Sequence, residues 1–385
     1  MEQKNNTNKL MAVLMSFFVM SFIDMVGIGV DRVTADFKLS NTLVQLIPSA
    51  AFLWFFILSV PVGILQDRIG KRMVLNIGMI ITAAGLFLPF FIYSFPTILA
   101  GFALLGIGNT IVQVSANPLL VDVVLPKQRS SALSFSQFIK AIGSMLAPPI
   151  AGWFALKFGD WKLLFLVSGI VSVLTVAWLA STKIEETQNT EKRATFASSF
   201  NLLNTGFISM MVLCIFLIVG IDVGVNAVSG QFLLIKFKSA STIAESGRSV
   251  YFFGKMLGTF GGALLLTMLP SRKFFLWSSI LALISILALL VAPTQMTALV
   301  IIFIIGLGVA NIFPLVFSIT VEKYPVRGNE ISGLMIMAVS GGAVIPLLIG
   351  WLTDFSASVT VGLFVLVACA VYELFAAIYN LKRTS

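Results

Sequence analysis

Long apolar runs, each about the length of one membrane crossing, follow one another along almost the whole chain. A bilayer core about 30 Å thick takes about 20 helical residues per crossing. Strands of a membrane barrel would instead give short segments of alternating polarity, so these runs predict helices. The twelve predicted helices lie near residues 10–30, 43–65, 73–93, 97–121, 131–156, 162–181, 207–234, 249–269, 274–292, 297–320, 330–353 and 358–381.

The composition agrees with a chain that lies in lipid. Of the 385 residues, 58% are hydrophobic and 11% are charged, and the mean hydropathy is +1.02. A water-soluble domain covers its surface with more polar residues than this. The first apolar run follows a polar start and lacks a small-residue cleavage site, which indicates a retained helix rather than a removed signal peptide. We expect an all-α membrane protein.

The charged and sulfur-containing residues exclude several functions. The formal net charge of +9 comes from basic residues spread one to three at a time between apolar runs, so no nucleic-acid partner is expected. The chain has no histidine, and its two cysteines, Cys214 and Cys369, fall in apolar runs, so neither a metal site nor a disulfide framework is predicted. We find no Walker loop and no catalytic triad, and we expect no enzyme activity and no cofactor.

Lysine and arginine counts predict the orientation, because these residues favour cytoplasmic loops. With the N-terminus inside, sixteen of the 25 lie in inner loops and ends, seven lie in outer loops, and Lys140 and Lys255 fall within helices. Both termini are therefore expected in the cytoplasm, as an even number of crossings requires. The expected location is a bacterial inner membrane, with the lipid bilayer as the surrounding partner and the protein acting as a monomer.

One polar stretch divides the crossings six and six. It covers Ser181 to Asn204 and carries six charged residues. We predict an N-terminal six-helix bundle over residues 1–181, a cytoplasmic linker over 182–206 and a C-terminal six-helix bundle over 207–385. Two such halves, related by pseudo-symmetry about an axis along the membrane normal, predict a site between them at mid-depth.

The loop after the second predicted helix is rich in glycine and charge. It runs Gly63-Ile-Leu-Gln-Asp-Arg-Ile-Gly-Lys-Arg72, and a weaker counterpart, Pro270-Ser-Arg-Lys273, follows the eighth predicted helix. The first loop resembles the signature of the major facilitator superfamily, with one arginine replaced by lysine, which implies the twelve-helix fold of that family. We expect a conformational latch in which the glycines allow close helix contact, the aspartate engages another helix and the cations lie at the inner leaflet. Its predicted residues are Gly63, Asp67, Arg68, Gly70, Lys71 and Arg72.

A finer resemblance covers most of the chain. The stretches Gln113–Leu119, Phe135–Gly143, Phe313–Ser318 and Ser340–Pro346 are similar to helices four, five, ten and eleven of the fucose-proton symporter family of sugar permeases. That resemblance implies uptake of a monosaccharide through a central cavity, driven by a proton gradient.

The chain also departs from the pattern of that family. It has Gln113 where the family has an acidic residue, and Lys140 where the family has an asparagine. The carboxylate of the family's first helix falls near Gly27, one turn from both Asp24 and Asp31. The proton site has therefore moved or the coupling has changed, and coupling to sodium stays open.

Charges inside the predicted helices are the candidates for coupling. A lone charge in lipid costs several kcal/mol, so Asp24, Lys140 and Asp222 should face water or each other. We predict that these three residues form an ion-pair set. Protonation of an aspartate in this set would weaken or strengthen its interaction with Lys140. Asp31 lies on the same helix face as Asp24, at the outer end. The alternative is a static pair that only fixes helix packing.

Polar side chains near the predicted cavity are the candidates for substrate binding. We expect Pro118 to interrupt the fourth helix and to open a cavity there. Amides could bind the hydroxyl groups of a sugar, although a bond between helices is the alternative for each. Two lysines within helices also allow an acidic sugar, and Glu373 is interpreted as structural. The predicted substrate-binding residues are Gln113, Asn117, Gln137, Lys140, Asn226, Gln231, Asn311 and Trp54.

Two other functions stay open. The run Gly143–Gly152 resembles the glycine-proline signature of exporters, which would make the protein an antiporter of drugs or metabolites with protons. A membrane sensor without transport is disfavoured, because neither tail holds a signalling domain. The preferred hypothesis is a secondary active transporter that takes up a monosaccharide or sugar acid with protons by alternating access.

Overall fold

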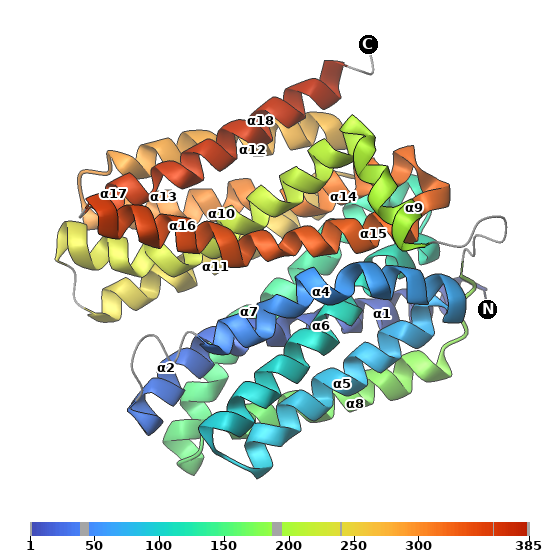
Figure 1. Cartoon of the computed structure of the whole chain (residues 1–385), viewed down its shortest axis with the longest axis horizontal. Coiled ribbons are helices and arrows are strands. Elements are labelled where there is room, and N and C mark those ends of the chain that lie inside the picture. The colour runs from blue at the N-terminus through green and yellow to red at the C-terminus, as the bar shows by residue number, and fades with distance from the viewer. Residues whose placement is uncertain (1, 39–45, 187–194, 239–240, 357, 383–385) are drawn as a thin grey trace. The chain divides into compact units, whose positions relative to one another are not determined.

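The structure is a computed structural model that describes residues 2–38, 46–186, 195–238, 241–356 and 358–382, and every regular element among them is helical (Figure 1). The first helix of the predicted set is formed by three consecutive elements, α1, η1 and α2. The elements of the first half are α1 (Glu2–Met20), η1 (Ser21–Met25), α2 (Val26–Phe37), α4 (Leu46–Ile69), α5 (Lys71–Phe91), α6 (Phe95–Val123), η2 (Pro126–Gln128), α7 (Arg129–Phe158) and α8 (Leu163–Ser181).

Two short elements precede the second half, which has the same order of long helices. The short elements are α9 (Phe196–Asn201) and η3 (Leu202–Asn204). The later elements are α10 (Gly206–Phe237), α11 (Ser241–Leu265), α12 (Ser271–Leu290), α13 (Gln295–Val309), α14 (Ile312–Lys323), η4 (Pro325–Arg327), α15 (Gly328–Met337), η5 (Ala338–Ser340), α16 (Gly341–Ser356), α17 (Val359–Gly362) and α18 (Phe364–Lys382).

Eleven helical stretches among the described residues are long and apolar enough to cross a membrane. The remaining expected crossing is α11, which has 25 residues but carries Arg248 and Lys255 and five glycines. Its length therefore suits a crossing while its hydropathy is low. The protein is a multi-pass membrane protein with the twelve-helix architecture that the sequence predicts.

Three of the crossings are broken near their middle. The first has the 3₁₀ segment η1, the tenth has two non-helical residues, Ala310 and Asn311, between α13 and α14, and the eleventh has the 3₁₀ segment η5. Breaks of this kind free backbone groups for other partners and are common where membrane helices bind ligands.

The chain forms two compact units, and each takes in one segment from the opposite half of the sequence. Unit 1 comprises residues 1–126, 139–201 and 326–337, and unit 2 comprises 127–138, 202–325 and 338–385. The short helix α15 thus belongs to unit 1, while the beginning of α7 belongs to unit 2. The sequence-based division at residues 181 and 207 has no such exchange and stays a prediction.

In unit 1, α6 is the central helix. Its residues from Gly108 to Val121 are all buried, and α4, α5 and α15 pack around it. Glycines allow the closest approach: a Cβ at Gly85 would lie 2.7 Å from the carbonyl oxygen of Gly101. In unit 2, α11 and α13 approach even more closely at Gly254 and Gly306, and α10 contacts α11, α16 and α18.

The expectation that Pro118 interrupts the fourth helix is wrong, because α6 continues through it from Phe95 to Val123. Proline has no N–H, so the carbonyl of Val114, four residues earlier, loses its helical donor. The hydroxyl of Ser332 in α15 donates to that carbonyl at 2.7 Å. A donor from another helix thus satisfies the freed oxygen, and the helix needs no break.

Candidate functional site

The charged loop between α4 and α5 is a tight turn held by an acidic cap. Gly70 has a φ of 90°, a left-handed conformation that favours glycine, and it is the residue that precedes α5. Glu186, which follows α8, accepts hydrogen bonds from the backbone N–H groups of Lys71 at 2.5 Å and Arg72 at 3.2 Å. A carboxylate at this position satisfies the free donors of the helix end and its partial positive charge.

The three cations of this loop have different surroundings. Lys71 is buried and forms an ion pair with Asp122 of α6 at 2.5 Å. The guanidinium of Arg72 donates to the carbonyl oxygen of Thr182, at the end of α8. Arg68 alone is exposed. The position of the three cations at the inner leaflet stays a prediction, and the structure adds that Lys71 is paired with Asp122 inside unit 1.

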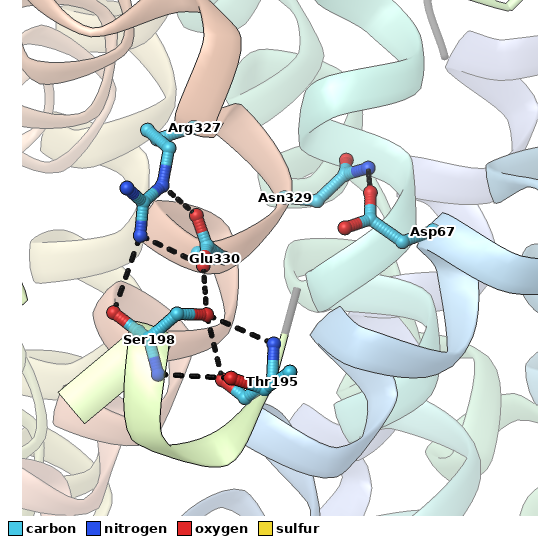
Figure 2. Close-up of polar contacts among 6 residues, drawn as sticks. All are labelled: Asp67, Thr195, Ser198, Arg327, Asn329 and Glu330. Atoms are coloured by element: carbon cyan, nitrogen blue, oxygen red, sulfur yellow. Dashed lines mark hydrogen bonds and ion pairs between the residues drawn. The ribbon is translucent and has the colours of Figure 1, made fainter. Parts of the chain in front are cut away.

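The other part of the predicted latch joins α4 to α15. The side-chain amide of Asn329 donates to the carboxylate of Asp67, as Figure 2 shows. One turn earlier in α4, Gly63 meets Gly333: a Cβ at Gly63 would lie 3.0 Å from the carbonyl oxygen of Asn329, and one at Gly333 would lie 3.1 Å from that of Ser59. The glycine contact and the aspartate contact that the motif predicts are thus both made with one short helix.

A second cluster at the beginning of α15 joins it to α9 (Figure 2). Arg327 forms an ion pair with Glu330 and also donates to the carbonyl oxygen of Ser198 at 3.3 Å. The Ser198 hydroxyl donates to Glu330 at 2.5 Å, and the backbone N–H of Ser198 donates to the Thr195 hydroxyl at 3.1 Å. This places the start of α15 against the segment that the sequence predicts to be a linker.

The corresponding contacts in unit 2 include a group of serine hydroxyls. The hydroxyl of Ser130, at the start of α7, lies 2.7 Å from that of Ser271 in α12 and 2.8 Å from that of Ser318 in α14. The Ser131 hydroxyl donates to the carbonyl oxygen of Ala263 in α11 at 2.5 Å. The start of α7 therefore packs in unit 2 through hydroxyl groups, and its first residue, Arg129, also interacts electrostatically with Glu322 of α14. α15 packs in unit 1 through charged and amide groups.

Asp24 lies in the break of the first crossing. It is half-buried in η1, and its carboxylate accepts a hydrogen bond from the hydroxyl of Ser144 in α7. α7 comes very close here, since a Cβ at Gly143 would overlap the Ser21 hydroxyl. Lys140 is half-buried one turn before Ser144, but among the described residues no ion pair joins it to Asp24, which corrects that expectation.

Asp222 lies in the continuous helix α10 and has a cationic partner. Lys255 of α11 forms an ion pair with it at 2.5 Å, and the Tyr251 hydroxyl donates to its other carboxylate oxygen at 2.6 Å. The predicted ion-pair set of Asp24, Lys140 and Asp222 does not include Lys255. The observed partner of Asp222 is therefore Lys255, which corrects the prediction. The side chain of Asp31, the fourth predicted coupling residue, lies outside the described part of the structure.

Two of the predicted substrate amides form a buried ladder along α6. Asn117 donates to the carbonyl oxygen of Gln113 at 2.8 Å, and Gln113 donates to the side-chain oxygen of Asn109 at 2.8 Å. Asn109 in turn donates to the carbonyl oxygen of Met20 at 2.7 Å, directly before η1. The ladder therefore links the predicted binding residues to the break that carries Asp24.

The remaining predicted substrate residues are spread over both units. Asn311 lies in the break between α13 and α14 and donates to the carbonyl oxygen of Gly258 at 2.7 Å. Within the described residues, the side-chain oxygens of Asn117, Asn226 and Asn311 are buried without a hydrogen-bond donor. Gln137 and Trp54 are half-buried, and the side chain of Gln231 lies outside the described part.

Four residues that the sequence analysis missed have clear structural roles: Asn109, Ser144, Tyr251 and Ser332. Asn109 could have been found from its spacing, since it precedes Gln113 by four residues as Gln113 precedes Asn117, and such residues share a helix face. The other three carry hydroxyl groups, and the sequence has many such residues with nothing to single these out. Their partners depend on tertiary packing, for which the sequence has no local signal.

A polar cluster outside the crossings holds the C-terminal end of α2. Asp36 accepts hydrogen bonds from the Tyr93 hydroxyl at 2.6 Å and from the Trp161 indole at 3.2 Å, and the ammonium of Lys162 lies 4.7 Å from the centre of the Tyr93 ring. Burial, followed by the hydrogen bond to Asp36, raises the pKa of Tyr93 well above its ordinary value. Tyr93 therefore stays protonated and keeps α2 tied to the neighbouring loops.

Twelve crossings in two compact units, with glycine-mediated contacts and a charged loop after the second crossing, define a membrane transporter fold. A family model of the Major Facilitator Superfamily matches residues 11–239, more than half of the chain. The chain belongs to that superfamily.

Individual relatives and a solved structure agree with the family assignment. A glucose/galactose transporter of Brucella abortus is 28% identical over 379 residues, which cover 91% of this chain and 89% of the relative. A multidrug resistance protein of Klebsiella pneumoniae is 24% identical over 92% of this chain and 90% of its own length. The structure of the E. coli fucose:proton symporter FucP superposes with a TM-score of 0.82 at 16% identity, over 96% of this chain and 98% of that one, which shows a shared fold.

Proposed function

We propose that this protein is a secondary active transporter that takes up a monosaccharide or a sugar acid with protons by alternating access. The superfamily consists of transporters, and the relatives include a glucose/galactose transporter over nearly the full length of both chains. The observation that carries the proposal is the hydrogen-bonded ladder from Asn117 through Gln113 and Asn109 to the break at Asp24.

The ladder supports a coupling between substrate and proton. The buried oxygen of Asn117 accepts no hydrogen bond, so a sugar hydroxyl could donate to it. At the other end, Asn109 holds the last carbonyl of α1 before η1. Binding a hydroxyl group at Asn117 would therefore act on the backbone around Asp24. The carboxylate there has the Ser144 hydroxyl as its described partner, and we assign it the coupling role.

The contacts of α15 support the alternation. In the described structure this helix packs in unit 1, whereas the rest of its crossing, α16, belongs to unit 2. Exchange between two states would require these contacts to break and re-form: the Asp67–Asn329 bond, the Gly63–Gly333 crossing and the bond from Ser332 to Val114. A latch of this kind raises the population of one of the two states while the other stays accessible.

The test is uptake of labelled neutral and acidic monosaccharides into proteoliposomes under imposed proton or sodium gradients. We expect a proton gradient to drive accumulation of at least one sugar. The Asp24→Asn variant should lose gradient-driven accumulation and keep exchange of sugar for sugar. Failure of every sugar, or accumulation driven by sodium alone, would contradict the proposal.

The second candidate is a drug or metabolite antiporter. It is supported by the glycine and proline run from Gly143 to Gly152 and by the multidrug resistance relative. Expulsion of hydrophobic cations from the same proteoliposomes, with no sugar transported, would establish it instead. In either case we expect a monomer in the bacterial inner membrane. We expect both termini in the cytoplasm, which the surplus of cations in the predicted inner loops supports.

A further inference from the structure

A carboxyl group lies in the middle of the buried face of α18, far along the chain from the residues discussed above. The buried residues of this helix recur every three or four positions, which defines one face. They are Leu366, Cys369, Ala370, Glu373, Ala376, Ala377 and Asn380. α18 packs against α10 and α12, so Glu373 occupies a position where the helix otherwise presents small or apolar side chains.

The surroundings of Glu373 contain no compensating charge. The side chain is 0% exposed, and within the described residues the weak thiol donor of Cys214 is the hydrogen-bonding group set against its oxygens. The titratable groups beside it are the thiols of Cys214 in α10 and Cys369 in α18 and the hydroxyl of Tyr372, and none of them is a cation.

The charged groups of the neighbouring helices lie elsewhere. α10 carries Asp222, eight residues or about 12 Å along the helix from Cys214, and Lys236 near its end. α12 has its two cations, Arg272 and Lys273, in the first turn, and α18 has Lys382 nine residues after Glu373. α17 has no charged residue, and the side chain of Asp354, in α16, lies outside the described part.

An ionised carboxylate in these surroundings would be strongly unfavourable. Removing a charge from water costs several kcal/mol even after relaxation, and a buried group with no partner escapes this cost by becoming neutral. A thiol is too weak a donor to replace the lost hydration. We propose that Glu373 is a proton-binding site, at which a neutral carboxylic acid stays packed between α10 and α18 throughout the transport cycle.

This site differs from the one proposed at Asp24. Asp24 lies half-buried in a helix break, beside the substrate ladder, and is the residue to which proton coupling is assigned above. Glu373 is fully buried in a continuous helix, on the face that α10 covers, where its proton is retained. The inference does not depend on the identity of the substrate or on proton coupling.

Infrared spectroscopy of the full-length protein in liposomes tests the proposal directly. A neutral carboxylic acid has a carbonyl band separate from those of carboxylates and amides. We expect the difference spectrum between the wild type and Glu373→Gln to contain this band at neutral pH, with slow exchange in heavy water. The matched control is Asp222→Asn, whose carboxylate is paired with Lys255 and should contribute no such band. Absence of the band from the Glu373→Gln difference spectrum would overturn the proposal.

Two further measurements separate the retained proton from other occupants. Glutamine has the size and neutrality of the protonated acid, so Glu373→Gln should keep the wild-type unfolding temperature and the wild-type accumulation of substrate. A loss of gradient-driven accumulation in this variant would mean that the proton exchanges. A rise in the unfolding temperature with added sodium, in the wild type but not in Glu373→Gln, would mean that the site holds an alkali cation. Either result would overturn the inference.

Discussion

Asp24 and Asp222 have similar settings in the sequence but different surroundings in the two units. Each follows an isoleucine in a crossing that opens its half of the chain, as Phe22-Ile23-Asp24 and Gly220-Ile221-Asp222. Asp24 lies in a helix break and has a hydroxyl partner, Ser144, whereas Asp222 lies in a continuous helix and is held by Lys255 and Tyr251. A carboxylate paired with a cation needs no proton to be stable in the membrane, and one that has a hydroxyl partner can gain from taking up a proton.

The loops that follow the second crossing of each half place their charges in comparable surroundings. Unit 1 has the buried ion pair of Lys71 and Asp122. In unit 2, Ser271 at the start of α12 is bonded to Ser130, and the next residue, Arg272, interacts electrostatically with Glu322 of α14. In both units, then, a cation in the first turn of this helix is set against a carboxylate from a later helix. In unit 1 this ion pair is separate from Asp24, which lies within the first crossing.

Replacing Asp24 by asparagine gives the largest expected effect. If that effect were absent, the contrast between Asp24 and Asp222 would be lost. An amide takes up no proton, so gradient-driven accumulation should fall by about tenfold or more, while exchange of substrate across the membrane continues. The measurement compares uptake under a proton gradient with exchange at equilibrium in the same proteoliposomes. Ser144→Ala is the matched control, because it keeps the carboxylate and should retain part of the accumulation. Unchanged accumulation in Asp24→Asn would move the proton site elsewhere.

The second test removes one partner of the fixed pair. Asp222→Asn leaves Lys255 unpaired in the membrane, and we expect a loss of about 2 to 3 kcal/mol of stability. Breaking a fully buried pair typically costs about 3 to 5 kcal/mol, and this pair keeps 21% and 28% of its side-chain surfaces exposed. Thermal unfolding in detergent measures the loss.

The double variant Asp222→Asn with Lys255→Met sharpens this result. It removes both charges, so most of the lost stability should return if the pair is static. If the two single losses simply add, the residues do not form a fixed pair, and the contrast with Asp24 weakens.

The third test concerns the carbonyl of Val114, which connects α6 to α15. Removing the Ser332 hydroxyl should cost about 1 kcal/mol, the usual contribution of one hydrogen bond. In a Pro118→Ala background the cost should be near zero, because the new N–H supplies the donor that proline lacks. A double-mutant cycle on the unfolding free energy measures the coupling between the two positions. Equal losses in both backgrounds would show that the hydroxyl does not act through this carbonyl.

The smallest effect is expected at Asp36, a carboxylate with neutral hydrogen-bond donors outside the crossings. Asp36→Asn removes a negative charge and an acceptor that both favour the protonated tyrosine. The pKa of Tyr93 should therefore fall toward its ordinary value, while burial keeps it somewhat raised. Ultraviolet absorbance of tyrosinate during an alkaline titration, compared between wild type and variant, measures the shift. No shift would mean that burial alone holds the proton on Tyr93.

The sequence predicted the crossings well because each depends on a local property, the length of an apolar run. It failed at the breaks. Pro118 lies in a continuous helix because Ser332, more than two hundred residues later, supplies a donor, whereas the 3₁₀ segments η1 and η5 contain no proline at all. Whether a helix breaks depends on partners from other helices, which the local sequence does not encode.

The candidate site follows the same division. The residue types of the charged loop and the presence of Asp24 and Asp222 in crossings could be predicted, because charge in an apolar run is visible in the sequence. Their partners could not. Lys255 meets Asp222 only because α10 and α11 pack in one particular register, and Asp122 and Glu186 reach the loop from the ends of two other helices.

The crossing of Gly63 with Gly333 has a consequence for how the α15 contacts respond to salt. The two backbones meet there without any charged group, so the attraction is short-ranged and independent of ionic strength. The neighbouring contacts of Asp67 and Arg327 involve half-buried charges, which dissolved ions screen in part. Raising the ionic strength should therefore loosen the polar contacts and leave the glycine crossing intact, which lets electrolyte alone separate the two contributions to the docking of α15.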